Sequence, residues 1–341
     1  CSSDLVYKGR TCLGPEASRC LIHLSRGGSD AVEIREFDFG DRNFVTAGFF
    51  LPEAKTQVEW LDVDHLLVGT NFGPGSLTTS GYPRMLKKWR RGTSLDQAEL
   101  VFEAAETDML VSADTIHRPE GDFTFIVRLP SFFQQEIHFY ESGKVMQLPL
   151  PLEVDYRGLL GELFLFELRS DWLVGEESFA AGDLVSIDLH KSLAAGRPVD
   201  VVRVFSPGAR MAIKSAVIGR DAVYLFVMDD VDGKLLELRP SIDGWDRKAV
   251  ELPDKGSLDL VTNDPIDDVL MVNYQSFTVP ASLYLINQGA EPELIKSEPA
   301  RFDAAGIVTR QHFADSRDGT RVPYYVIARE DMPLDGSNPT V

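Results

Sequence analysis

The sequence predicts an all-β fold, a β-propeller of four-stranded antiparallel blades, and three observations support it. Short apolar runs recur along the 341 residues at intervals of roughly 40–60 positions. A second run with alternating apolar and polar residues follows each of them, as expected for strands with one face in a core. Turn-forming pairs such as Asp-Gly and Ser-Gly separate the runs. A repeat of about 45 residues with several strands per copy is typical of a propeller. The six runs are PEASRCLIHL (15–24), DVDHLLVGTN (62–71), PEGDFTFIVR (119–128), GLLGELFLFEL (158–168), GRDAVYLFVM (219–228) and PIDDVLMVNY (265–274).

About six units follow one another along the chain. Residues 5–39 supply three strands of the first unit, and the clearest complete unit spans residues 46–103. The fourth unit has a weakly marked first strand near 153–157, and HKSLAAG (190–196) fits a single helical turn. The other expected strands are 57–61, 64–70, 83–91 and 98–103; 109–114, 123–129, 136–142 and 145–151; 163–169, 184–190 and 199–205; 212–219, 222–228, 235–241 and 247–253; and 257–263, 268–274, 282–288 and 292–298.

The pattern changes after residue 303. Residues 308–331 read as two longer strands joined at Asp318-Gly319, and the turn-rich tail MPLDGSNPTV follows them. Such a hairpin and tail do not complete a blade. We therefore expect a propeller over residues 1–305 and the start of another domain over residues 306–341.

Charge and hydropathy exclude several classes of function. The chain carries 34 Lys and Arg against 53 Asp and Glu, a net charge of −19, which repels phosphate backbones and argues against nucleic-acid binding. No apolar run reaches the roughly 18 residues that a membrane-spanning helix needs. The sequence starts at Cys1 and not at Met, so its first residues do not decide between a cytoplasmic and a periplasmic location.

Three cysteines occur, Cys1, Cys12 and Cys20. Cys12 and Cys20 flank the turn LGPEASR, so a hairpin there would place them opposite each other and allow a disulfide. Two reduced thiols within a blade are the alternative, and the sequence leaves both open.

Four segments resemble the prolyl oligopeptidase family of serine peptidases. FDAAGIVTRQHFADSRDGTRVPYYVIARED (302–331), followed by LDGSNPT, looks like the passage that links propeller to hydrolase in this family. SFTVPASLYL (276–285), HLLVGTNFGPGSLTTSGYPR (65–84) and CLIHLSRGGSDAVEIREFD (20–38) are similar to propeller passages of its bacterial members. The resemblance covers essentially the whole chain.

The resemblance implies a seven-bladed propeller that caps an α/β-hydrolase domain with a Ser-Asp-His triad. Because about six blades can be counted, the first blade is expected to be missing. The hydrolase domain is expected to be truncated, because the sequence stops just before the glycine-rich segment that the resemblance places after SNPT. The parent protein would be a serine-type endopeptidase that cleaves short peptides after proline, with the propeller excluding large proteins. The expected partners are the chain's own C-terminal hydrolase domain and a short peptide substrate. A stand-alone propeller that serves as a protein-interaction scaffold is the alternative.

The chain itself is predicted to be inactive. No serine lies in the G-x-S-x-G elbow that the family's nucleophile needs, and Gly73-Pro74-Gly75-Ser76-Leu77 lacks the closing glycine. The six histidines are dispersed, so no catalytic base can be assigned. Asp229-Asp230-Val231-Asp232-Gly233 lacks the spacing and the distal glutamate of a calcium loop. We therefore expect no metal and no cofactor.

Loop aromatics are the candidate functional residues. In an antiparallel four-stranded blade, the loop between the second and third strands leaves at the same end as the connection to the next blade. The hydrolase domain would attach at that end, so these loops would line the domain interface or the peptide cavity. Alternatively, the aromatics fold back onto the propeller. The candidates are Phe72, Phe132, Phe133, Trp172, Phe179, Tyr274 and Phe277.

Overall fold

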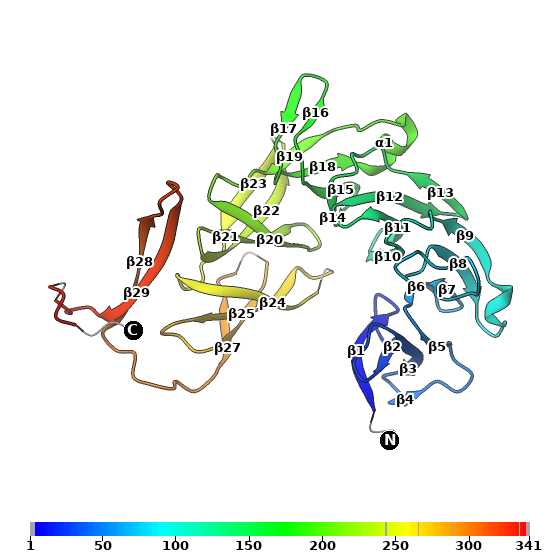
Figure 1. Cartoon of the computed structure of the whole chain (residues 1–341), viewed down its shortest axis with the longest axis horizontal. Coiled ribbons are helices and arrows are strands. Elements are labelled where there is room, and N and C mark those ends of the chain that lie inside the picture. Colours follow the sequence, from blue (N-terminus) through cyan, green and yellow to red (C-terminus); the bar gives the residue numbers. More distant parts are fainter. Residues whose placement is uncertain (1–3, 243, 265, 289, 334, 339–341) are drawn as a thin grey trace. The chain divides into compact units, whose positions relative to one another are not determined.

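A computed structural model describes residues 4–242, 244–264, 266–288, 290–333 and 335–338. The chain divides into two compact units, Cys1–Val202 and Arg203–Val341, which run from blue to green and from green to red in Figure 1. The described residues are mostly β-strand and form six sheets of four or five strands, with two smaller hairpins. The expected all-β class and the antiparallel four-stranded blades are confirmed.

In the first sheet, the strand β3 has neighbours on both sides. β1 (Leu5–Cys12) pairs with β2 (Arg19–Arg26), and β2 pairs with β3 (Val32–Asp38). The short β4 (Asn43–Phe44) and β5 (Phe50–Ala54) share the other edge of β3. The sequence-based layout gave residues 46–54 to the next unit, and the structure corrects this: β5 pairs with β3 and completes the first sheet.

The second and third sheets are antiparallel meanders in which successive strands pair, and in the fourth sheet β15 pairs with β18 because a separate two-stranded hairpin intervenes. A 3-10 helix (Leu95–Gln97) precedes β9, and α1 (Leu189–Ala195) follows β18 close to the expected helical turn. Asp188 caps α1 by accepting a hydrogen bond from the N–H of Lys191 at 2.9 Å. The strands are β6 (Gln57–Asp62), β7 (His65–Gly69), β8 (Met85–Arg90) and β9 (Glu99–Glu103); β10 (Leu110–Arg118), β11 (Gly121–Ser131), β12 (Gln134–Glu141) and β13 (Lys144–Gln147); and β14 (Val154–Leu160), β15 (Leu163–Leu168), β18 (Leu184–Asp188) and β19 (Val202–Phe205).

The fifth and sixth sheets belong to the second unit. Both are four-stranded antiparallel meanders, and a separate two-stranded hairpin, β28–β29, follows them as expected (Figure 1). The strands are β20 (Met211–Ile218), β21 (Val223–Asp229), β22 (Asp232–Ser241) and β23 (Gly244–Ala249); β24 (Gly256–Asp264), β25 (Val269–Ser276), β26 (Ser282–Ile286) and β27 (Glu293–Ser297); and β28 (Ile307–Asp315) and β29 (Arg321–Arg329).

Central strands are buried on both faces because the sheets stack face to face within each unit. VYLFV in β21 and the FLF of β15 are buried without interruption, whereas the outer strand β27 is exposed throughout. A continuous apolar run thus marks a strand between two sheets. The seam between the third and fourth sheets is aromatic: the Phe125 and Phe164 rings lie 5.2 Å apart, centroid to centroid.

A buried carboxylate ties the first sheet to the second. The side chain of Glu36, on β3, is fully buried and lies 2.7 Å from Nη1 of Arg91, which follows β8. It also accepts a hydrogen bond from the backbone N–H of Phe49 at 2.9 Å and pairs with Arg19 at 3.3 Å. These partners compensate the desolvation of the charge, so removing them would leave an uncompensated buried ion.

Cys12 and Cys20 form a disulfide. They are direct partners in the register of β1 and β2, which brings their side chains together. Of the two alternatives that the sequence left open, the structure contains the bonded pair.

Candidate functional site

Phe132 and Phe133 occupy the tight turn between β11 and β12 in the third sheet. The turn has no other residues between the strands, and the two side chains are 78% and 67% exposed. The guanidinium carbon of Arg169, at the end of the fourth sheet's second strand, lies 5.6 Å from the centroid of the Phe133 ring. Two exposed aromatic rings and a cation thus share one patch at the loop end of these sheets.

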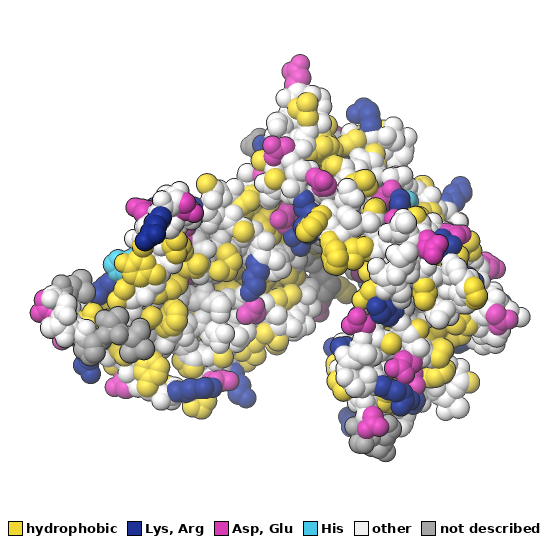
Figure 2. Space-filling model, viewed as in Figure 1, with side chains coloured by type: hydrophobic (Ala, Val, Ile, Leu, Met, Phe, Trp, Pro, Cys, Tyr) yellow, Lys and Arg dark blue, Asp and Glu magenta, His cyan; other side chains and the backbone are white. Residues whose placement is uncertain are grey.

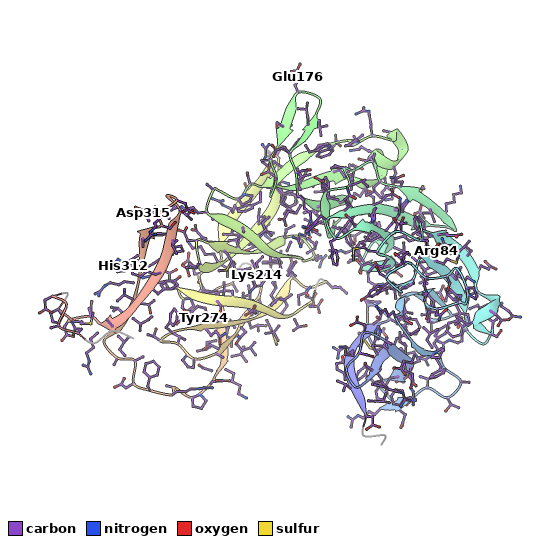
Figure 3. The ribbon with its side chains drawn as sticks, viewed as in Figure 1. Arg84, Glu176, Lys214, Tyr274, His312 and Asp315 are labelled. Carbon is purple, nitrogen blue, oxygen red and sulfur yellow. A yellow bond between two sulfur atoms is a disulfide. The ribbon has the colours of Figure 1, made fainter. Side chains whose placement is uncertain are left out.

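The equivalent connection of the fourth sheet is longer and contains regular secondary structure. Residues 169–182 contain a two-stranded hairpin, β16 (Trp172–Val174) and β17 (Glu177–Phe179), whose tip residue Glu176 points away from the sheet (Figure 3). Phe179 is fully buried and is corrected from a contact residue to a core residue. Trp172 is half-buried between Phe166 and Phe179, at ring distances of 5.7 and 5.8 Å.

Phe72 is also only partly exposed. It packs against the hydrophobic core of the first two sheets, and Nζ of Lys87 lies 4.4 Å from its ring centroid. The adjacent Ser76, part of the incomplete elbow motif, is buried and bonds locally. Its Oγ donates to the carbonyl of Gly73 and accepts the N–H of Phe72. Ser76 is therefore a loop-closing residue, as expected.

In the second unit, Tyr274 is buried whereas Phe277 is exposed. Tyr274 lies inside β25, is 1% exposed and donates its hydroxyl to the carbonyl of Asp254 at 2.9 Å. It is therefore corrected to a core residue. Phe277 follows β25, is 53% exposed and contacts the Tyr325 ring of β29 at 5.5 Å.

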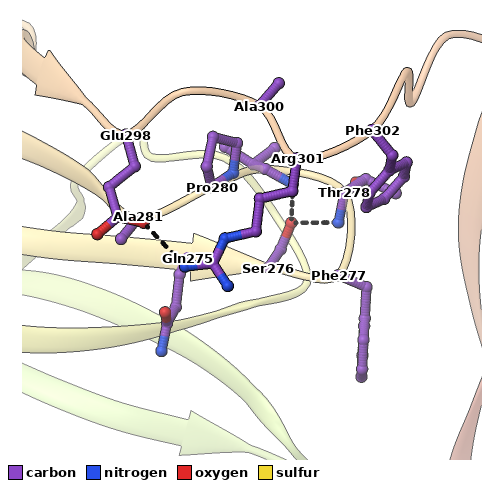
Figure 4. A pocket seen from close by; sticks show the side chains of 11 residues that line it. Gln275, Ser276, Phe277, Thr278, Pro280, Ala281, Glu298, Ala300, Arg301 and Phe302 are labelled. Carbon is purple, nitrogen blue, oxygen red and sulfur yellow. Dashed lines mark hydrogen bonds and ion pairs between the residues drawn. The ribbon is translucent and has the colours of Figure 1, made fainter.

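Phe277 is one of the residues that line a pocket of about 390 Å³ (Figure 4). One wall is the loop between β25 and β26, and the other is the segment that leaves the sixth sheet after Ser297. Glu298 and Arg301 form an ion pair at 3.6 Å beside Phe302, which is exposed. The pocket can therefore contact apolar and charged groups together. Its lining residues are Gln275, Ser276, Phe277, Thr278, Val279, Pro280, Ala281, Glu298, Ala300, Arg301 and Phe302.

Sequence reasoning found Phe277 but missed Glu298, Arg301 and Phe302. The available signal was an aromatic residue in the segment after the last blade. The contact role of Phe72, Phe132, Phe133, Trp172 and Phe277 stays a prediction.

An acidic cluster lies on the first strands of three successive sheets in the first unit. Tyr156, on β14, donates its hydroxyl to Asp114, on β10, at 2.9 Å. Burial raises the pKa of Glu59, on β6, to about 8, and the Asp114 carboxylate adds to this effect. Burial likewise raises the pKa of Asp114. Desolvation by the surrounding strands therefore makes both carboxyls hold protons more tightly than a carboxyl in water, although Asp114 keeps contact with solvent.

The described residues offer little for metal or membrane chemistry. Among them, no three His, Cys, Asp or Glu side chains gather as metal ligands would. Nor does any described helix have the length and apolar character to cross a bilayer. Acidic and basic side chains are interspersed on the face shown in Figure 2, over both units.

Comparison with known families and proteins gives consistent matches. The family described as "Prolyl oligopeptidase, N-terminal beta-propeller domain" matches residues 9–297. An uncharacterized peptidase, y4nA, of Sinorhizobium fredii is 33% identical over 98% of this chain and 47% of its own length. An uncharacterized peptidase of Rickettsia prowazekii, RP174, is 25% identical over 99% of this chain and 49% of its own length. The chain thus spans about half the length of these relatives.

Solved structures share the fold. A post-proline cleaving enzyme from Rickettsia typhi superposes with a TM-score of 0.86 at 25% identity, covering 98% of this chain and 51% of that enzyme. Oligopeptidase B from Trypanosoma brucei gives a TM-score of 0.73 at 16% identity, over 99% of this chain and 47% of that protein.

Proposed function

Since the chain belongs to the prolyl oligopeptidase family and contains that family's N-terminal β-propeller domain, we propose that it is the non-catalytic part of a serine peptidase. The complete protein would cleave short peptides after proline, and the propeller would restrict access to the hydrolase site. The similarity to a post-proline cleaving enzyme over half of that enzyme's length supports this proposal.

The pocket around Phe277 is the observation that carries the proposal. The pocket lies between a loop of the sixth sheet and the segment that leads out of that sheet. A domain that follows this segment would therefore begin next to the pocket. Phe132 and Phe133 lie at the corresponding end of the third sheet. We propose that these loops contact the hydrolase domain or the bound peptide.

We further propose that the hairpin β28–β29 opens the hydrolase domain and that residues 1–305 form the propeller. Support comes from the family match, which ends at residue 297, and from the pairing of β28 and β29 only with each other in the described sheets. Lys255 ties the hairpin to the sixth sheet, because its Nζ donates to the carbonyl of Thr309 at 2.9 Å.

An open sheet face supports the expectation of one further blade. On the first sheet, Phe39, Phe44 and Phe50 are exposed, with the guanidinium of Arg35 about 6 Å above two of the rings. Apolar sheet faces elsewhere in this unit pack against a neighbouring sheet. A seventh sheet, supplied by residues outside this chain, would cover the patch.

Activity measurements test the proposal at the level of the whole protein. The full-length product should hydrolyse a short peptide after proline, and purified residues 1–341 should not. Cleavage by residues 1–341 alone would contradict the proposed division of labour. A full-length product without peptidase activity that instead binds a protein partner would favour the scaffold alternative.

Variants of the full-length protein test the contact residues. Replacing Phe277 and Arg301 with Ala should lower kcat/KM for the peptide by about tenfold or more, since positioning contacts would be lost. Leu294→Ala is the matched control, because Leu294 is 53% exposed like Phe277 but lies within the outer strand β27 of the same sheet. Equal kinetics in both variants would remove Phe277 and Arg301 from the site.

A further inference from the structure

The disulfide closes a short loop at one end of the first sheet. Residues 13–18 connect β1 to β2, and Cys12 and Cys20 join the two strands at the base of this loop. Inside the loop, the N–H of Leu13 donates to the carbonyl of Arg19 at 2.9 Å, and the N–H of Ala17 donates to the carbonyl of Leu13 at 3.0 Å. The loop is therefore a compact element.

The tip of the loop rests on another sheet. A Cβ added to Gly14 would overlap the ring of His117, so the backbone at Gly14 packs closely against that imidazole. His117 stands near the end of β10 in the third sheet, and its Nδ1 lies 2.7 Å from a carboxylate oxygen of Asp122 on β11. This pair holds the ring in place beneath the loop.

Two contacts with the second sheet and its core support the base of the loop. The indole N–H of Trp60, on β6, donates to the carbonyl of Thr11 at 3.0 Å. Leu13 packs against the core that the first and second sheets share. The loop thus starts from the first sheet, crosses the end of the second and reaches the third.

We propose that the Cys12–Cys20 loop is a redox-sensitive strap that fastens the first sheet to the third. While the disulfide is intact, the loop holds Gly14 on the ring of His117. Reduction leaves the loop ends held only by non-covalent contacts, so the loop opens away from His117 more often. In the open state the first sheet is held by its seam with the second sheet alone. This inference does not depend on the proposed peptidase function.

The reaction needs a dithiol reductant. One thiolate of the dithiol attacks Sγ of Cys12, which is half-buried, whereas Cys20 is fully buried. The bond between the two cysteine sulfurs breaks, and Cys20 leaves as a thiolate that takes up a proton. The second thiol of the reductant then displaces Cys12 as a thiol. Two electrons pass from the reductant, which ends as a cyclic disulfide.

Hydrogen exchange on residues 1–341, with and without dithiothreitol, tests the strap. Reduction should speed amide exchange on the order of tenfold at residues 14–18 and at residues 117–122, because local opening exposes both partners. Exchange in β21, in the second unit, serves as the internal control and should not change. Equal exchange at residues 117–122 in both states would overturn the proposal.

Two variants separate the covalent bond from the contact. The double variant Cys12→Ser with Cys20→Ser should match the reduced protein and no longer respond to dithiothreitol. Gly14→Ala keeps the disulfide but displaces the loop from His117, so it should raise exchange at residues 117–122 without any reductant. Thiol titration should find Cys12 and Cys20 oxidised in protein purified in air, and two free thiols there would also overturn the proposal.

Discussion

The third and fourth sheets carry aromatic residues at equivalent positions but use them in opposite ways. In the third sheet, Phe132 and Phe133 stand exposed on a two-residue turn. In the fourth, the connection grows into the β16–β17 hairpin, and Phe179 is fully buried at its end. Connection length makes the difference, because a longer connection can fold back and bring an aromatic ring onto the core.

Polar anchors fix the longer connection. Asp183 accepts a hydrogen bond from the N–H of Ala180 at 3.0 Å, and Asp171 accepts one from the N–H of Ala181 at 2.9 Å. Ala180 and Ala181 are exposed, so these bonds fix the turn that follows β17 and do not serve to pair buried backbone groups. The comparison teaches that an aromatic residue in a loop becomes a contact residue only where the loop is too short to bury it.

Phe179→Ala should have the largest effect on stability. Removing a fully buried ring leaves a cavity, so the free energy of unfolding should fall by about 3–5 kcal/mol. Chemical denaturation of the variant would measure this loss. Leu173→Ala, on the exposed face of the same hairpin, should cost less than about 0.5 kcal/mol. Similar losses in both variants would break the comparison.

Asp183→Ala should have an intermediate effect. The N–H of Ala180 would lose its partner. Because Ala180 is exposed and water can replace that partner, the free energy of unfolding should fall by about 0.5–1.5 kcal/mol. Denaturation and hydrogen exchange of the β16–β17 hairpin would measure it together. A loss of stability without faster amide exchange in the hairpin would show that Asp183 does not act by stabilising this hairpin.

One carboxyl lies near each of the two compared connections, Asp108 in the third sheet and Glu167 in the fourth. Their contributions to the free energy of unfolding should change with pH in opposite directions. A hydrogen bond from Arg128 at 2.8 Å keeps the pKa of Asp108, at the base of the third-sheet loop, below its ordinary 3.8. Its stabilisation is therefore present above that value and is lost as the pH falls through the folded-state pKa. Burial raises the pKa of Glu167, on β15, above its ordinary 4.5, against the opposing effect of Arg157. Its contribution is present below 4.5 and is lost as the pH rises through the folded-state pKa.

Melting temperatures between pH 3 and pH 8 would test this contrast. Asp108→Asn should flatten the acid side of the profile, and Glu167→Gln should flatten the side above pH 4.5. If the dependence of the melting temperature on pH is unchanged in a variant, the carboxyl that was replaced does not cause the pH effect.

Phe132→Ser with Phe133→Ser should have the smallest effect on stability. Both rings are exposed, so the free energy of unfolding should change by no more than about 0.5 kcal/mol. The melting temperature of residues 1–341 would check this. A large loss would mean that the rings pack in solution and that the two loops are alike.

The sequence by itself determined the repeat of strands, the change of pattern after residue 303 and the near absence of helix. These follow from alternation and turn residues, which act over a few neighbouring positions. The expected strands 57–61 and 64–70, for instance, agree with β6 and β7 to within one residue. The family could also be read from the sequence, because four long segments retain its residues.

Only the tertiary structure decided which aromatics are available for contact. Phe179 and Phe132 each follow a serine in the connection between two paired strands, but Phe179 packs on Trp172, which in turn packs on Phe166. Two further features could not be predicted from the sequence. One is the pairing of β5 with the first sheet, and the other is the contact of the Gly14 loop with His117. Each joins segments separated by intervening chain, and the energy of such a contact depends on where the whole sheet places its partner.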